Sequence, residues 1–157
     1  MIINFYKYQG TGNDFIIIDD RKNTFDINNV ILISSLCDRR YGIGADGLIL
    51  LRDHDQYDFE MIYFNADGYQ STMCGNGGRC IIHFAQMLKI VENKTLFIAI
   101  DGVHKGYYAQ EIISIQMKDV ESIKLLGKDL VIDTQGPTVV SVSSTTVDGA
   151  YNLGDTI

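Results

Sequence analysis

The sequence predicts an α+β fold of the α/β roll type, in which an antiparallel or mixed sheet wraps around a central apolar helix. Residues 81–90 are apolar except for His83, Gln86 and Lys89, which recur at every third position as one narrow polar stripe. A helix that is apolar over most of its circumference belongs inside a protein. Roughly five or six runs of strand length surround it in the sequence. A hydrophobic content of 46% in 157 residues is ample for a core.

The first predicted strands lie at residues 2–8, which alternate imperfectly between apolar and polar, and at 15–19, which are mostly apolar. The Gly-Thr-Gly turn at 10–12 between them is either a simple hairpin turn or a functional loop. Further on, the N-cap candidates at 26–29 precede apolar positions that share one face of a helix ending near Cys37. Cys37 is therefore expected in the core.

The glycine-rich segment GIGADG at 42–47 formally matches a dinucleotide-binding fingerprint. It follows charged residues at 38–40 and leads into an apolar strand at 48–51, whereas the fingerprint requires a strand before it and a helix after it. Nucleotide binding is therefore rejected, and a tight loop beside the active centre is expected. The polar segment 52–58 contains several carboxylates and His54, and it is read as a solvated loop in preference to a metal site.

Further strands are predicted at 59–64, 95–100 and 111–117, the last two separated by the glycines of the region 101–108. From residue 118 onward the pattern changes. Alternating runs at 128–133 and 138–143 indicate the start of a second unit, but fewer than about forty residues cannot form another core of equal size.

Composition excludes several classes of function. A formal net charge of −7 argues against nucleic acid or anionic membranes as partners, since both reward clustered lysine and arginine. No apolar run reaches the length of a membrane span, and the first residues lack the pattern of a signal peptide, so a cytoplasmic location is expected. Three cysteines without framework spacing fit reduced thiols, and their spacing does not fit a zinc site, so no metal is expected.

The segment Met-Cys-Gly-Asn-Gly-Gly-Arg-Cys at 73–80 places the Cys74 thiol at the start of the apolar helix. The first backbone N–H groups of a helix lack intrahelical partners, and glycines let them come close to a bound group. Such a helix end attracts anions and favours the thiolate form of a cysteine. Cys80 lies further into the helix and is expected to be packed.

Together with Asn-Ala-Asp-Gly at 65–68, this segment resembles the first catalytic segment of diaminopimelate epimerase. That family contains the cofactor-independent isomerase of bacterial lysine and peptidoglycan-precursor synthesis. GTGNDF at 10–15, RRYGIGADG at 39–47 and DGVH at 101–104 support the resemblance in their order and approximate spacing. The match is good to about residue 118.

The resemblance implies an enzyme that interconverts LL- and meso-diaminopimelate without pyridoxal phosphate or another cofactor. Cys74 would be one of two thiols that exchange protons with the substrate α-carbon, one on each face. Asn13, Asn65, Gly75 and Asn76 would bind the substrate, and a homodimer is a possible assembly.

The later part of the chain departs from the family pattern. The family has an Asn-x-Gly-x-Pro-His-like segment where residues 133–138 read DTQGPT, and no second Cys-Gly-x-Gly follows. The expected organisation is an N-terminal epimerase half at 1–118 and the beginning of a second, incomplete half at 119–157. The alternative function is therefore a catalytically inert, truncated half that only binds a ligand or a partner.

A third hypothesis makes Cys74 a nucleophile in acyl transfer. It requires an activating base nearby. His83 lies on the same helix nine positions on, and nothing in the sequence places His54 or His104 close to the thiol. Formation of a covalent acyl-enzyme would identify this case.

Overall fold

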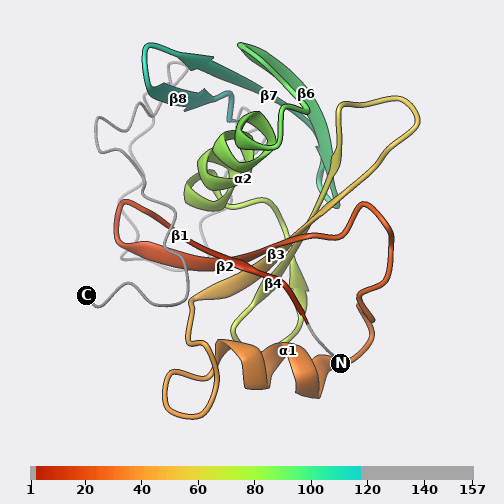
Figure 1. The fold of residues 1–157 in the computed structure, drawn as a ribbon, viewed down its shortest axis with the longest axis vertical. Coiled ribbons are helices and arrows are strands. Elements are labelled where there is room, and N and C mark those ends of the chain that lie inside the picture. The colour runs from red at the N-terminus through yellow and green to blue at the C-terminus, as the bar shows by residue number, and fades with distance from the viewer. Residues whose placement is uncertain (1–2, 118–157) are drawn as a thin grey trace, which may run out of the picture.

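The structure, a computed structural model, describes residues 3–117. The predicted strands at 128–133 and 138–143, and with them the second unit, lie outside the described residues. The described part contains eight strands and two helices (Figure 1). They are β1 (Tyr6–Gly10), β2 (Asn13–Asp19), α1 (Val30–Cys37), β3 (Gly47–Arg52), β4 (Glu60–Asn65), β5 (Gln70–Ser71), α2 (Gly75–Met87), β6 (Lys94–Ala99), β7 (Gly102–Ala109) and β8 (Ile112–Ile115).

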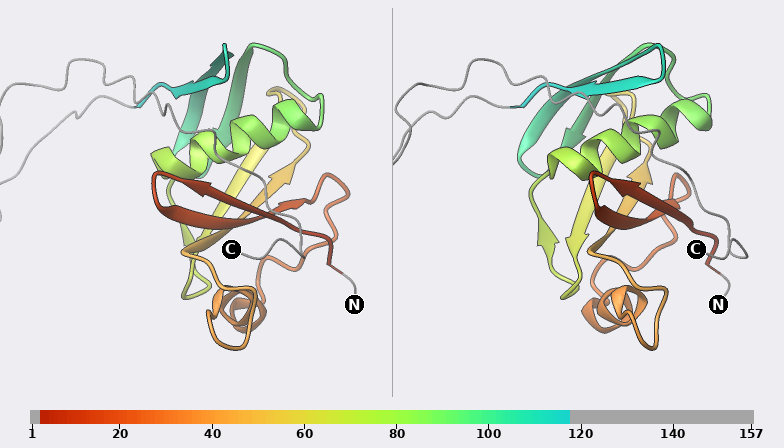
Figure 2. Two further views of the ribbon diagram at one scale, coloured as in Figure 1. Left: turned by 60° about the vertical axis from the view of Figure 1, so that its left-hand side comes forward. Right: turned by 90° about the vertical axis from the view of Figure 1, so that its left-hand side faces the viewer.

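The strands form one mixed sheet in the order β1-β2-β3-β4-β6-β7-β8, with the short β5 paired to β4. β2 and β3 are parallel, and so is the single pairing between β4 and β6, whereas the other neighbours are antiparallel. Helix α2 contacts β1, β2 and β3 as well as β7 and β8. Figures 1 and 2 show it between the β1–β2 hairpin and the β6–β8 strands, with α1 at the opposite face of β3.

Two hydrophobic cores lie on the two faces of the sheet because successive side chains of a strand point to opposite sides. In β2, Phe15 and Ile17 join the core under α2, while Ile16 and Ile18 join the core under α1. Strand β3 divides its residues in the same way. Both faces of these strands are therefore covered, which explains their nearly continuous apolar sequences.

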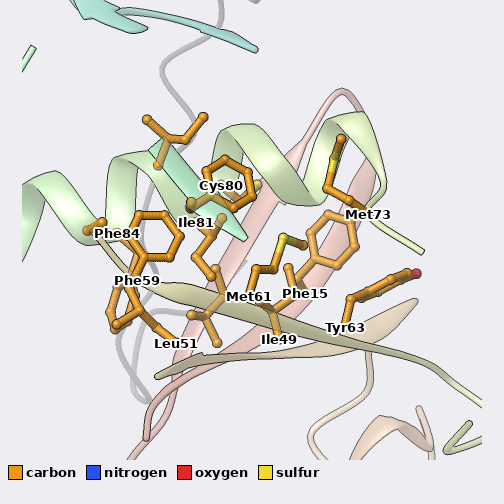
Figure 3. Close-up of a cluster of buried hydrophobic side chains, with 14 of the residues drawn as sticks. Phe15, Ile49, Leu51, Phe59, Met61, Tyr63, Met73, Cys80, Ile81 and Phe84 are labelled. Carbon is orange, nitrogen blue, oxygen red and sulfur yellow. The ribbon is translucent and has the colours of Figure 1, made fainter. Parts of the chain in front are cut away.

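The larger core lies between α2 and the sheet. Figure 3 shows Ile81 and Phe84 of the helix meeting Leu51, Phe59 and Met61. Phe84 is fully buried, and its ring also packs against the ring of Tyr6 at a centroid distance of 4.9 Å. Burial of these side chains fixes the helix across the sheet. This contact positions the N-terminal end of α2, where Cys74 lies.

The structure corrects the expected end of this helix. Helix α2 begins at Gly75, directly after Cys74 as expected, and it ends at Met87 instead of continuing to residue 90. Leu88 caps the helix, and Lys89 has a φ of +59°, a left-handed conformation that the helix cannot continue through. The predicted polar stripe is otherwise confirmed, since His83 and Gln86 are only partly buried.

Strand β7 was not predicted, because its sequence Gly-Val-His-Lys-Gly-Tyr-Tyr-Ala contains two glycines and few aliphatic side chains. Its residues have a low intrinsic preference for strands, and hydrogen-bonded pairing with β6 and β8 on both sides stabilises the strand instead. Gly106 is required by packing: a Cβ there would lie 2.4 Å from Ile82 Cδ1 of α2 and 2.8 Å from Thr95 Cγ2. The strands predicted before residue 118 and the helix at 30–37 are confirmed, although the first strand begins at Tyr6 instead of residue 2 and the other ends shift slightly. Neither of the helices described in residues 3–117 has the length and apolar character needed to cross a membrane.

Candidate active site

Cys74 is the N-cap residue of α2, as the sequence predicts for the start of this helix. Its backbone is extended, with φ −95° and ψ 134°, and its side chain makes no capping hydrogen bond to the helix. The thiol is partly exposed, whereas Cys37 and Cys80 are both buried. Burial raises the pKa of the Cys37 thiol to about 11. Cys74 is therefore the one accessible thiol among the three cysteines.

The first turn of α2 consists of Gly75, Asn76, Gly77 and Gly78. The Gly78 amide donates to the Cys74 carbonyl oxygen at 2.7 Å, which closes the turn. The preceding amides of a helix have no intrahelical acceptor and point out of its N-terminal end. A Cβ at Gly78 would lie 2.5 Å from Ile115 Cδ1 and 3.0 Å from Met73 Sδ, so this glycine also serves close packing against β8.

A line of hydrogen bonds joins this turn to two other predicted motifs. Asn76 Nδ2 donates to Asn13 Oδ1 at 2.5 Å, and Asn13 Nδ2 donates to Asp46 Oδ2 at 3.1 Å. Arg79 Nη2 donates both to Asn76 Oδ1 at 2.5 Å and to Thr11 Oγ1 at 2.8 Å. The glycine-containing turns at 10–12 and 42–47 are thereby held at the N-terminal end of α2, beside Cys74.

Charged side chains fix the outer side of these loops. Asp14 binds Lys7 Nζ at 2.8 Å and Arg39 at 2.7 and 3.0 Å, and Arg39 also binds Asp46 Oδ1 at 2.8 Å. Partial burial opposes ionisation of Asp14, but the hydrogen bonds from Arg39 and Lys7 outweigh it and hold the pKa of this carboxyl well below its ordinary value. Asp14 is therefore ionised at neutral pH and clamps the loop that carries Asp46.

The segment before Cys74 is held by a separate contact. Asp101 Oδ1 accepts from the Met73 amide at 3.2 Å and lies 3.2 Å from Nε2 of the buried His104. Burial raises the pKa of Asp101, but the Met73 amide and His104 outweigh burial and lower it overall. The carboxylate thus fixes the position of the backbone directly before Cys74.

The Tyr63 phenol lies close enough to Cys74 to be affected by its charge. Burial and the negative charge of a Cys74 thiolate raise the pKa of this phenol to about 12.

Four of the five predicted site residues lie together at the end of α2: Asn13, Cys74, Gly75 and Asn76. Asn65 is the last residue of β4. It pairs with Gly47 of β3, the residue directly after Asp46, so the backbone of Asn65 lies next to the loop that carries Asp46. The hydrogen bonds that connect Asn13 and Asn76 do not include the side chain of Asn65 within residues 3–117.

Sequence reasoning missed Arg79, Asp46, Thr11 and the pair of Asp101 with His104. The spacing of three between Asn76 and Arg79 was the available signal, since residues three apart meet on one helix face. Thr11, Asp46 and Asp101 each contact a site residue that is distant in sequence, and only the fold brings these partners together.

The histidines do not support the acyl-transfer hypothesis. His83 Nδ1 lies 3.1 Å from the Tyr8 hydroxyl, on the part of α2 away from Cys74. His54 accepts from the Gln56 amide in its exposed loop, and His104 pairs with Asp101. Within residues 3–117, the hydrogen bonds of His54 and His104 therefore go to Gln56 and Asp101 and not to the Cys74 thiol.

Comparison with solved structures defines the class of fold. The chain superposes with a TM-score of 0.59 on a phenazine biosynthesis protein of the PhzF family from Bacillus anthracis, at 16% identity, covering 74% of this chain and 41% of that one. It superposes with a TM-score of 0.57 on a hydroxyproline epimerase from Agrobacterium vitis, at 10% identity, covering 73% and 41%. The mixed sheet with few helices is thus the fold shared by PhzF-type and epimerase-type proteins.

Sequence comparison then identifies the family. The diaminopimelate epimerase family model matches residues 5–105. A diaminopimelate epimerase of Flavobacterium psychrophilum is 55% identical over 136 residues, which are 86% of this chain and 53% of that protein. One from Campylobacter lari is 38% identical over 122 residues, covering 78% and 48%. The chain belongs to the diaminopimelate epimerase family, and it spans about half the length of these curated relatives.

Proposed function

We propose that the chain contributes one half of a diaminopimelate epimerase active site, with Cys74 as one of the two proton-transfer groups. One observation carries the proposal: a partly exposed thiol lies at the N-terminal end of a buried helix, without a side-chain capping bond. Asn13, Gly75 and Asn76 surround it and bind the substrate, and Asn65 binds it from the end of β4. Membership in the family supports diaminopimelate as the substrate.

The reaction inverts an α-carbon by removing a proton from one face and delivering another proton to the opposite face. The Cys74 thiolate takes the α-proton, so the C–H bond breaks, an S–H bond forms, and the electron pair spreads onto the substrate carboxylate. The backbone amides at the start of α2, which have no intrahelical acceptor, stabilise this negative charge as it develops. A proton then returns to the opposite face from a second acid. Because Cys37 and Cys80 are buried, we assign this second acid to a group outside residues 3–117.

The proposal extends to the organisation of the protein. Residues 1–118 form the epimerase half that carries the first catalytic cysteine, in a roll whose central helix is α2. The contacts of α2 with β1, β2, β3, β7 and β8 support this description. Residues 119–157 begin a second, similar half. The chemistry needs only thiols and amides, so we propose an enzyme without pyridoxal phosphate that works on a small amino acid in the cytoplasm.

Proton NMR in deuterium oxide tests the function. Diaminopimelate incubated with the purified chain is expected to lose its α-proton signal as deuterium enters, and Cys74→Ala is expected to abolish this exchange. Cys37→Ala is the matched control, because this buried thiol takes no part. Appearance of the other stereoisomer would show that the second acid is also present. Exchange that persists in Cys74→Ala would contradict the proposal, and no exchange in the parent chain would favour the inert binding half.

A further inference from the structure

The side-chain hydrogen bonds from Arg79 through Asn76 and Asn13 to Asp46 form one continuous chain, the amide relay. We propose that Arg79 is a positioning residue that sets the direction of this relay, so that Asn76 and Asn13 offer N–H donors to a substrate carboxylate. This role deepens the proposed function and rests on it for the class of substrate. Arg79 itself acts through the two asparagines and not on the reacting atoms.

The two ends of the relay determine its direction. A guanidinium can only donate hydrogen bonds, and a carboxylate can only accept them. Because Arg79 donates to Asn76 Oδ1, the Asn76 amide must turn its Nδ2 toward Asn13, and Asn13 must then turn its own Nδ2 toward Asp46. A flip of either amide would place two donors or two acceptors against each other.

The direction matters for what the site can bind. Each side-chain amide nitrogen carries two hydrogens, and the relay uses one of them. The second N–H of Asn76 and of Asn13 can therefore donate to a carboxylate, in addition to the backbone amides of the helix start. A flipped amide would present a carbonyl oxygen, which repels a carboxylate. The relay thus selects an anionic group over an ammonium group at this position.

The burial of Arg79 supports a specific role. The side chain is 1% exposed, and none of the ion pairs found in residues 3–117 includes it. A buried charge is costly unless polar groups compensate for it, and an apolar residue could fill the same volume at lower cost. Helical side chains lean toward the N-terminus, so the guanidinium reaches the first turn of α2. Its positive charge therefore lies at the anion-binding end of the helix.

A purely structural role is the competing explanation, because Arg79 also donates to Thr11 in the β1–β2 turn at 2.8 Å. If this were the only role of Arg79, replacing Arg79 or Thr11 would loosen the β1–β2 turn to the same extent. The two explanations differ in their predictions for Thr11→Ala. This change deletes the contact to the turn and leaves every bond of the relay in place.

The experiment uses the 157-residue chain with ¹⁵N-labelled asparagine. Hydrogen exchange of the side-chain amides of Asn13 and Asn76 is followed by NMR, and diaminopimelate is titrated by calorimetry. In Arg79→Met we expect both amides to lose protection and the Kd to rise about 10- to 100-fold, as for a lost hydrogen bond with a charged donor. Arg79→Lys restores one donor and part of the affinity, whereas Thr11→Ala retains both protection and affinity.

Asp46→Asn tests the relay from its other end. Arg79 still orients Asn76 in this variant, so Asn76 is expected to stay protected while Asn13 loses part of its protection. If Arg79→Met fails to fold, Asn76→Asp replaces it: the new carboxylate accepts from Arg79 but cannot donate to Asn13. Loss of protection at Asn13 then supports the relay.

Three results would overturn the inference: equal effects of Arg79→Met and Thr11→Ala, unchanged amide protection in folded Arg79→Met, or unchanged protection of Asn13 in Asn76→Asp. The proposed function fails separately. If the parent chain does not bind diaminopimelate, the substrate assignment is wrong, but the amide exchange still decides whether Arg79 directs the relay.

Discussion

Alkylation of the three cysteines should be strongly selective for Cys74 in the folded chain. Iodoacetamide reacts with the thiolate, and it must reach the sulfur. Burial raises the pKa of Cys37 from its ordinary value of 9.0 to about 11, so below pH 9 its thiolate is depleted about 100-fold relative to an ordinary thiol. Cys37 is also only 3% exposed, and Cys80 is 0% exposed. Cys74 should therefore react at least ~100-fold faster than Cys37.

The assay is a time course of iodoacetamide labelling at several values of pH between about 6 and 9, with each cysteine-containing peptide quantified by mass spectrometry. The same reaction in concentrated urea is the control, because unfolding should bring the three rates within a few fold of one another. Labelling of Cys37 or Cys80 before Cys74 in the folded chain would refute the assignment of the reactive thiol.

Two further predictions concern stability. Asp14 has a folded pKa below its unfolded value, so its contribution is fully present above a pH of ~3.9 and is lost as the pH falls toward the folded pKa. In acid titrations, Asp14→Asn should be less stable than the parent at pH 6, and the difference should shrink at low pH; a constant difference would contradict the clamp. Phe84→Ala should lower the free energy of unfolding by about 3–5 kcal/mol, because its ring is fully buried between α2 and the sheet. Urea denaturation measures this loss, with the half-exposed Leu96→Ala as a control that should cost far less.

Local sequence patterns were sufficient for most of the fold. The apolar runs around residues 15–19, 48–51 and 59–64 were predicted as strands, and the structure shows why they are apolar throughout. Both of their faces are covered by a core, so apolar and polar residues need not alternate along them. The start of the helix at 30–37 was predictable from its N-cap candidates, and in the structure Asn29 Oδ1 accepts a hydrogen bond from the Leu32 amide. Strand β7 could not be predicted locally, because its glycine at 106 reflects the approach of Ile82 from α2.

The candidate site was only partly predictable for a similar reason. Cys74 and the amides after it are local features of a helix start, and the sequence contains them directly. The amide relay and the Asp101 contact with Met73 join residues separated by 28 or more positions, apart from the helical pair of Asn76 with Arg79. The sequence therefore predicted the GIGADG segment only as a tight loop beside the active centre, and it did not indicate that Asp46 ends the relay.

A crystal structure of the chain with bound diaminopimelate would test the central claim most directly, namely that the N-terminal end of α2 is the substrate site. We predict a substrate carboxylate on the backbone amides of Gly75, Asn76 and Gly77, with the α-carbon about 3–3.5 Å from the Cys74 sulfur. A substrate bound elsewhere, or helix amides already bonded to protein oxygens in its presence, would contradict the claim.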